Sequence, residues 1–463
     1  MLLLRGNAGI SATFRALFAL SFLPTFLAVG ILFSSHVLGQ SKFDREPVRY
    51  QATQPNDAVW KLKRRLESES TKLKWDSKQG WLPDLLEKLE IDSHSQNLVF
   101  SKTSLQTRHI SPSNPRAIFF NDDIYIGYVP GGDLIEISAV DDQLGAVFYT
   151  IKQVKPKADE FPVIRRDENQ CLTCHETSKT RDVPGYLVRS VFPSASGHPH
   201  YGMGTTTTDP TIEFKKRFGG WYVTGSHGKL RHRGNVIAKK SATSPVDFEA
   251  GANRESLPKT VDPSKYPAQS SDIVALMVLE HQSQMHNAIT FANFETRQAL
   301  YQQAVMNKAL ERESNYRSES TQRRIKAAGD DLLRTLFFCD EWELDDRVVG
   351  NTKFSENFEG QGPHDSKKRS LREFDLKTRM FKYPCSYLIY SSSFDRLPAE
   401  VRGYVESQVF SILTSQVSAD SKTSDPYHHL DAKDRKAILE ILLETKPGFK
   451  SKFERWKKSR EEK

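Results

Sequence analysis

The chain has 463 residues, a formal net charge of +8 and 27% charged residues. Its 66 Lys and Arg are spread among 58 Asp and Glu, unlike the clustered basic surface of a nucleic-acid-binding protein, so we expect no nucleic-acid partner. The length allows two or three domains or one large one, and it is ample to bury a substantial core.

The first 39 residues have the composition of a secretory signal peptide. Arg5 and Arg15 precede an apolar run over 16–33, and small residues that include Gly39 end the segment. The run approaches the length that crosses a bilayer, so an uncleaved membrane anchor is the alternative. We therefore expect an exported, periplasmic protein that contacts a membrane only if the leader stays attached.

The next two regions differ in their apolar pattern. Residues 40–110 are charged and have helical spacing, including a short amphipathic helix over 81–89. Residues 111–260 are β-rich: β-branched and aromatic runs separated by turn residues predict a small antiparallel meander. The predicted strands cover 117–120, 123–128, 134–137 and 146–151. A stretch rich in Gly, Pro, Thr and His follows over 183–240, with a further strand predicted over 220–225.

The region 261–463 is mainly helical. The patterns predict helices from 271 to 338 with breaks, over 398–415, and after Asp431, which supplies a capping side chain. A polar segment over 350–377 reads as a loop. The fold class is therefore α+β, with a β-rich part, a Gly-rich wrap and a helical C-terminal half.

The pentad Cys171-Leu172-Thr173-Cys174-His175 spells C-x-x-C-H, the pattern at which haem is attached covalently. Two cysteines three positions apart lie on one side of a helical turn, so both sulfurs can bond one porphyrin. The adjacent histidine is then the proximal iron ligand. We expect one haem c with its iron. The alternatives are a thioredoxin-like redox pair, which should open a helix after a strand, and half of a zinc site, which needs a second C-x-x-C. The pentad follows a polar run instead of a strand, and the sequence has no second C-x-x-C.

The sixth iron ligand decides between an electron carrier and an open haem that binds small molecules. Three side chains are candidates. Met203 stands between glycines, His227 lies in a Gly-rich stretch, and His281 shares a helical face with Met277 and Met285. A buried histidine on an apolar face is also a common core residue, so the choice among the three stays open.

Three further residues have predicted roles. Arg189 could bind a haem propionate through its two-point guanidinium, and a structural or surface arginine is the alternative. Cys339 and Cys385 lie beside aromatic residues. In an oxidising compartment they could form a disulfide, or both could be buried thiols.

The leader, the C-x-x-C-H pentad and the large flanking body together resemble an exported single-haem c-type cytochrome. Three stretches look like those of a group of large bacterial cytochrome c-like proteins: RFGGWYVTGSHGKLRHRGN over 217–235, LMVLEHQSQMHN over 276–287 and YPCSYLIYSSSFDRLP over 383–398. The resemblance implies thioether bonds at Cys171 and Cys174 and proximal ligation by His175. It implies no substrate.

These observations favour one-electron transfer with a redox partner protein or a small-molecule electron donor or acceptor. The alternatives are a haem enzyme of the peroxidase or oxidase kind, or a haem-based sensor of small ligands with an open axial position.

Overall fold

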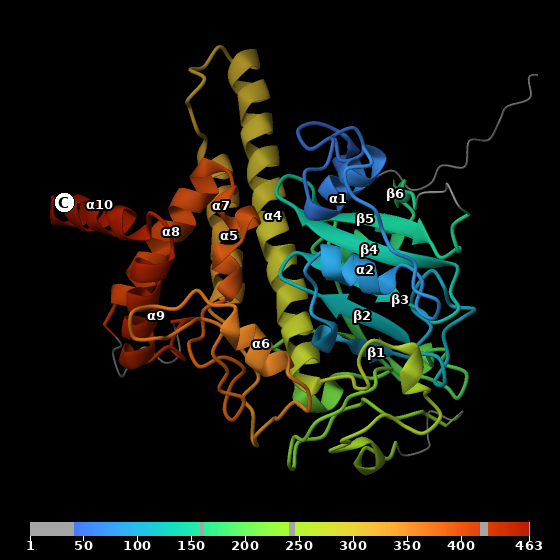
Figure 1. Cartoon of the computed structure of the whole chain (residues 1–463). Coiled ribbons are helices and arrows are strands. Elements are labelled where there is room, and N and C mark those ends of the chain that lie inside the picture. Colours follow the sequence, from blue (N-terminus) through green and yellow to red (C-terminus); the bar gives the residue numbers. More distant parts are fainter. Residues whose placement is uncertain (1–40, 158–161, 240–245, 417–424, 463) are drawn as a thin grey trace, which may run out of the picture. The chain divides into compact units, whose positions relative to one another are not determined.

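A six-stranded antiparallel meander is the centre of the N-terminal half (Figure 1). The computed structural model describes residues 41–157, 162–239, 246–416 and 425–462, so the expected leader lies outside the described residues. The strands follow one another in chain order: β1 (Asn97–Val99), β2 (Arg116–Phe120), β3 (Ile124–Tyr128), β4 (Leu134–Asp141), β5 (Gly145–Lys152) and β6 (Ile164–Arg166). The predicted meander is confirmed, and its four predicted strands correspond to β2–β5.

One face of the sheet is fully buried by the N-terminal helices. Alternate residues such as Phe119, Ile126 and Ile137 point to this face, and each is at most 2% exposed. Two helices cover it, α1 (Ala58–Glu67) and α2 (Leu82–Lys88). Trp81, before α2, donates from Nε1 to the Lys152 carbonyl at 3.1 Å. The opposite face is therefore the one available to the rest of the chain.

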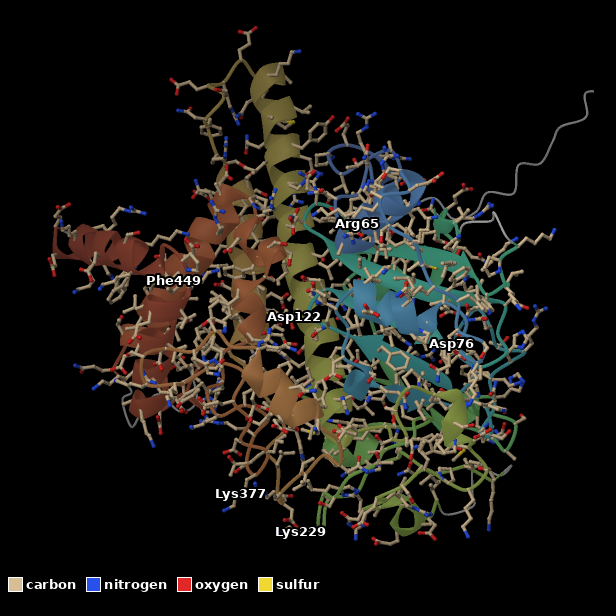
Figure 2. All side chains as sticks on the ribbon, viewed as in Figure 1. Arg65, Asp76, Asp122, Lys229, Lys377 and Phe449 are labelled. Carbon is tan, nitrogen blue, oxygen red and sulfur yellow. The ribbon has the colours of Figure 1, made fainter. Side chains whose placement is uncertain are left out.

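A 37-residue helix, α4 (Ile273–Ala309), runs along the turns at one end of the sheet. The Asp272 side chain caps it by accepting from the backbone N–H groups of the first turn. His286 Nε2 contacts the Asp122 carbonyl at 2.8 Å, and Asn293 Nδ2 donates to the Asp142 carbonyl at 3.0 Å. Figure 2 labels Asp122 at this junction. Because α4 lies between the sheet and further helices, it is buried on most sides.

The helices that follow α4 in the chain lie on its other side (Figure 1). They are α5 (Glu319–Leu336), α6 (Phe354–Gly360), α7 (Ser392–Asp395), α8 (Ala399–Thr414), α9 (Ala432–Thr445) and α10 (Phe449–Glu461). The helices predicted over 271–338, over 398–415 and after Asp431 are confirmed, and Asp431 caps α9. The segment over 350–377 is not wholly a loop, since α6 buries Phe354 and Phe358, one turn apart.

The Gly-rich region contains less regular structure than predicted. It forms a two-stranded hairpin of β7 (Val188–Val191) and β8 (Thr205–Thr208). The strand predicted over 220–225 is wrong, since only isolated bridges form there, such as Val99 with Trp221. Gly220 and Gly225 have φ of +88° and +126°, which interrupts an extended strand.

The described residues from 41 onward form one compact unit, and its α+β class is as predicted. Within the described ranges, no helix is both long and apolar enough to cross a bilayer.

Candidate functional site

The C-x-x-C-H motif begins a single helical turn at the edge of the sheet. Asp167 follows β6, and its carboxylate accepts from the Cys171 backbone N–H at 2.9 Å. This contact starts α3 (Leu172–His175), which Leu172 anchors in the core at 4% exposure. Cys171 and Cys174 are free thiols, partly buried and exposed respectively. Their spacing of three places both sulfurs on one side of the turn.

His175 is held in one tautomer. Its Nδ1 lies 2.9 Å from the Gly185 carbonyl, which can only accept a hydrogen bond, so Nδ1 carries the proton. Burial is the main cause that lowers the pKa of His175, which keeps the imidazole neutral. The lone pair is then on Nε2. A neutral imidazole whose far N–H donates to a backbone carbonyl is the usual arrangement of a metal-bound histidine.

The two alternatives to haem attachment fit less well. Burial, followed by the nearby Asp167 charge, raises the pKa of the Cys171 thiol, whereas a reactive cysteine of a thioredoxin-like pair needs a lowered one. Among the described residues, no group of three or more His, Cys, Asp or Glu side chains is arranged to hold a metal ion. The described residues therefore supply no further ligands for a zinc ion at Cys171 and Cys174, whereas a porphyrin would bring its own four nitrogens.

His175 packs on the sheet face that α1 and α2 leave free. Its ring centroid lies 4.8 Å from that of Phe148 on β5. Thr150 is two residues further along β5 and so shares the Phe148 face. The strand register places Thr150 next to Glu136, which is next to Gly127. We call Gly127, Glu136 and Thr150 the cross-strand row. It lies directly beside the motif.

Asn287 of α4 fixes the backbone that supports His175. Its side-chain Oδ1 accepts from the Tyr186 N–H at 2.8 Å, and its Nδ2 donates to the Tyr186 carbonyl at 2.7 Å. A Cβ added at Gly185 would overlap the Asn287 side chain, so only glycine fits there. The long helix thus holds in place the Gly185 carbonyl that binds His175.

His281, a predicted sixth ligand, faces away from the motif. Its ring stacks on Phe338 at a centroid distance of 4.2 Å, and its Nε2 lies 2.8 Å from Ser386 Oγ. Burial lowers its pKa to about 3. His286 lies on the opposite side of α4, 6.1 Å from the Tyr125 ring of the sheet. The structure therefore places His281 in the helical half as a core residue.

The other two sixth-ligand candidates are also away from His175. His227 uses both ring nitrogens, since Nδ1 donates to the Leu230 carbonyl at 2.7 Å and Nε2 accepts from the Asn253 N–H at 2.9 Å. Met203 ends the short turn before β8. The pairing of β7 with β8 puts it beyond the Val191 end of the hairpin, one strand length from Gly185. None of the three is brought to the motif.

The predictions for Arg189, Cys339 and Cys385 have different outcomes. Arg189 lies on β7, where its guanidinium donates to Thr205 Oγ1 at 3.2 Å, and propionate binding by it stays a prediction. Cys339 and Cys385 are both buried and free, which agrees with the thiol alternative rather than the disulfide.

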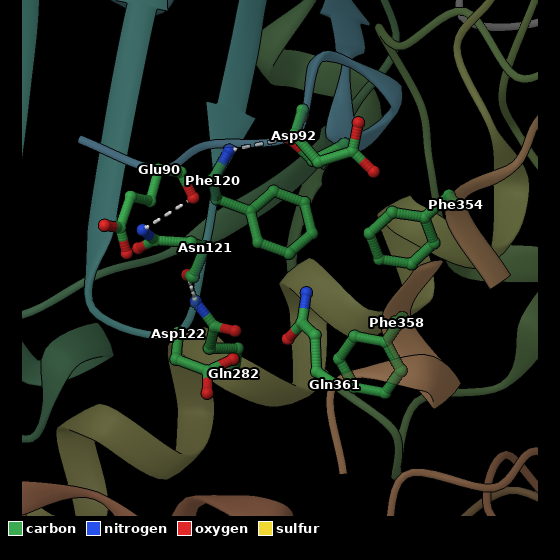
Figure 3. Close-up of a pocket in the computed structure, with 10 residues that line it drawn as sticks. Glu90, Asp92, Phe120, Asn121, Asp122, Gln282, Phe354, Phe358 and Gln361 are labelled. Carbon is green, nitrogen blue, oxygen red and sulfur yellow. Dashed lines mark hydrogen bonds between the residues drawn. The ribbon is translucent and has the colours of Figure 1, made fainter. Parts of the chain in front are cut away.

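Two hollows in the described surface lie outside this site. One of about 50 Å³ is lined by Phe120, Asp122, Gln282 and the two phenylalanines of α6, and Figure 3 shows those rings facing Phe120. It has room for little more than water. The other, of about 340 Å³, is lined by Ser111, Tyr222 and Arg254 among others. Neither has Cys171 or His175 in its lining.

Sequence reasoning missed the residues that surround the motif. Gly185 had a weak signal, because Pro184-Gly185 marks a turn ten positions after His175. Phe148, Glu136 and Asn287 had none, since their part depends on strand register and helix packing. No protein-family model, curated protein or solved structure matches the chain. The geometry of the site is therefore the basis for the function proposed below.

Proposed function

We propose that this protein is an exported monohaem c-type cytochrome that binds haem through Cys171 and Cys174 and transfers single electrons. The observation that carries the proposal is the His175 hydrogen bond to the Gly185 carbonyl, beside two free thiols on one helical turn. With its proton on Nδ1, His175 would offer Nε2 to the haem iron as a neutral ligand. When bound, the haem supplies reversible one-electron chemistry at its iron.

The rest of the chain contributes support and an environment. The Gly185 carbonyl orients the ligand, Phe148 packs against its ring, and Leu172 fixes the turn in the core. Cys174 lies at the protein surface, so the proposed haem would be attached within reach of a redox partner protein or a small-molecule electron donor or acceptor.

The test is expression with export and haem-attachment machinery, followed by intact mass and reduced-minus-oxidised absorption. We expect one haem per chain in the wild type and no covalent haem in Cys171→Ser/Cys174→Ser. The control Cys339→Ser/Cys385→Ser removes the other two cysteines and should keep the haem. A wild-type protein that acquires no haem, or a control that loses it, would contradict the proposal.

A second function has one observation in its favour. None of the three sixth-ligand candidates lies beside His175, which suits a haem enzyme or sensor with an open axial position. Carbon monoxide binding separates the two. A low-spin spectrum indifferent to carbon monoxide supports the carrier, and a high-spin ferric spectrum with rapid carbon monoxide binding supports the enzyme or sensor.

A further inference from the structure

An ion pair lies on the sheet face beside the motif. Arg116 begins β2, and its guanidinium pairs with the Glu136 carboxylate of the cross-strand row. The two side chains are only 20% and 15% exposed. A pair this far from solvent is screened much less than a surface pair, so its charges act strongly on their neighbours.

The pair is close to both functional groups of the motif. The Arg116 charge contributes, after burial, to the lowered pKa of His175. Glu136 adds to the raised pKa of the Cys171 thiol, whose largest cause is burial, and Arg116 opposes it. The strand register also places the ion pair near His175. Glu136 is next to Thr150, which is two residues along β5 from Phe148, and Phe148 packs on His175.

The Arg116 guanidinium lies over the glycine of the cross-strand row. Gly127 carries no side chain, and a Cβ there would overlap the Arg116 guanidinium. Arg116 Nε is buried and makes no hydrogen bond to any described residue. The same is true of Arg189 Nε, so the pairing of Arg116 with Glu136 of the row distinguishes the two arginines. An unpaired buried donor is unfavourable, and an added carboxylate acceptor would satisfy it. Guanidinium binds carboxylate at two points, so Arg116 can hold an anion and keep Glu136 nearby.

We propose that the haem lies over the Glu136 and Thr150 part of the cross-strand row and that Arg116, held by Glu136, binds one of its propionates. This inference rests on the proposed covalent attachment at Cys171 and Cys174. It assigns to Arg116 the part that the sequence suggested for Arg189. It also makes the sheet, rather than the Gly-rich segment, the surface against which the cofactor packs.

The experiment measures two properties of haem-loaded protein: the reduction potential, and the propionate bending band in the resonance Raman spectrum. A nearby positive charge stabilises the reduced iron, so Arg116→Gln should lower the potential and shift the band. Glu136→Gln should raise the potential. Arg116→Lys keeps the charge but loses the two-point geometry, so it should shift the band with a smaller change in potential.

A matched control is Arg108→Gln, which removes a guanidinium that also pairs with a carboxylate, Asp133, but is 72% exposed. It should change neither property. If Arg116→Gln does not fold, Arg116→Lys and Arg116→Gln/Glu136→Gln test the same contact without leaving Glu136 opposite an uncharged partner.

The outcomes separate the two proposals. Haem-loaded Arg116 variants with the wild-type band and potential would overturn this inference and leave the proposed function intact. A band that moves in Arg189→Gln instead would also overturn it. A wild-type chain without covalent haem would instead refute the proposed function.

Discussion

Replacing Asn287 by alanine removes both hydrogen bonds that hold the Tyr186 backbone beside His175. Asn287 is 5% exposed, and its bonds to the Tyr186 N–H and carbonyl measure 2.8 and 2.7 Å. Each buried backbone group left unpaired costs about 1–3 kcal/mol, so the loss of both partners should lower the free energy of unfolding by about 2–6 kcal/mol. That is a large part of the stability of an ordinary domain.

The same change should reach the proposed haem through His175. Without Asn287 the Gly185 carbonyl is less well fixed, so its hydrogen bond to Nδ1 weakens and the imidazole becomes a poorer donor to iron. A weaker imidazole donor destabilises the oxidised iron more than the reduced iron, so the reduction potential should rise. Urea unfolding followed by circular dichroism measures the first effect, and spectroelectrochemistry of haem-loaded protein measures the second.

Asn293→Ala is the control. Asn293 is on the same helix, is also 5% exposed, and donates one hydrogen bond to the Asp142 carbonyl, away from the motif. It should cost about 1–2 kcal/mol and leave the potential unchanged. The reasoning is refuted if Asn287→Ala costs no more than Asn293→Ala and both keep the wild-type potential.

Three further predictions test the structure. His281→Ala and His227→Ala should each lower the melting temperature and leave the haem spin state unchanged, because both rings are packed away from His175; conversion from low to high spin in either would instead identify an iron ligand. Burial raises the pKa of Asp123 to about 7, so its protonated form stabilises the fold below about pH 4 and this stabilisation is lost as pH rises through 7. Asp123→Asn should therefore be more stable than wild type above pH 7, by about 1–3 kcal/mol, and the two should converge near pH 4; equal pH profiles in urea unfolding would contradict this. Cys339 and Cys385 should be alkylated only after unfolding, and without a reductant, as seen by intact mass; a requirement for reductant would show a disulfide.

Much of the fold could be predicted from residue spacing. Runs of β-branched and aromatic residues between turn residues predicted β2–β5. Helical patterns over 271–338, over 398–415 and after the capping Asp431 predicted α4, α5, α8 and α9. The predictions were wrong where the local sequence pattern differs from the backbone conformation or the packing that the folded protein has. Gly220 and Gly225 interrupt the strand predicted over 220–225, and Phe354 and Phe358 form a buried helix inside a polar stretch.

The sixth-ligand candidates illustrate the limit of sequence reasoning at the site. His281 has the spacing of a residue on an apolar helical face, and that spacing is equally right for a core histidine. Only its contacts with Phe338 and Ser386 decide between the two. A periodic pattern says that a face is buried, but it does not say which partner buries it.

The C-x-x-C-H motif is the part of this protein that the sequence determined by itself. Five consecutive residues fix the spacing of Cys171, Cys174 and His175, because the local geometry of one helical turn needs no other part of the chain. The tertiary structure decided what surrounds the motif. Gly185, Asn287 and the Arg116–Glu136 pair meet it through strand register and helix packing, which join residues far apart in the chain.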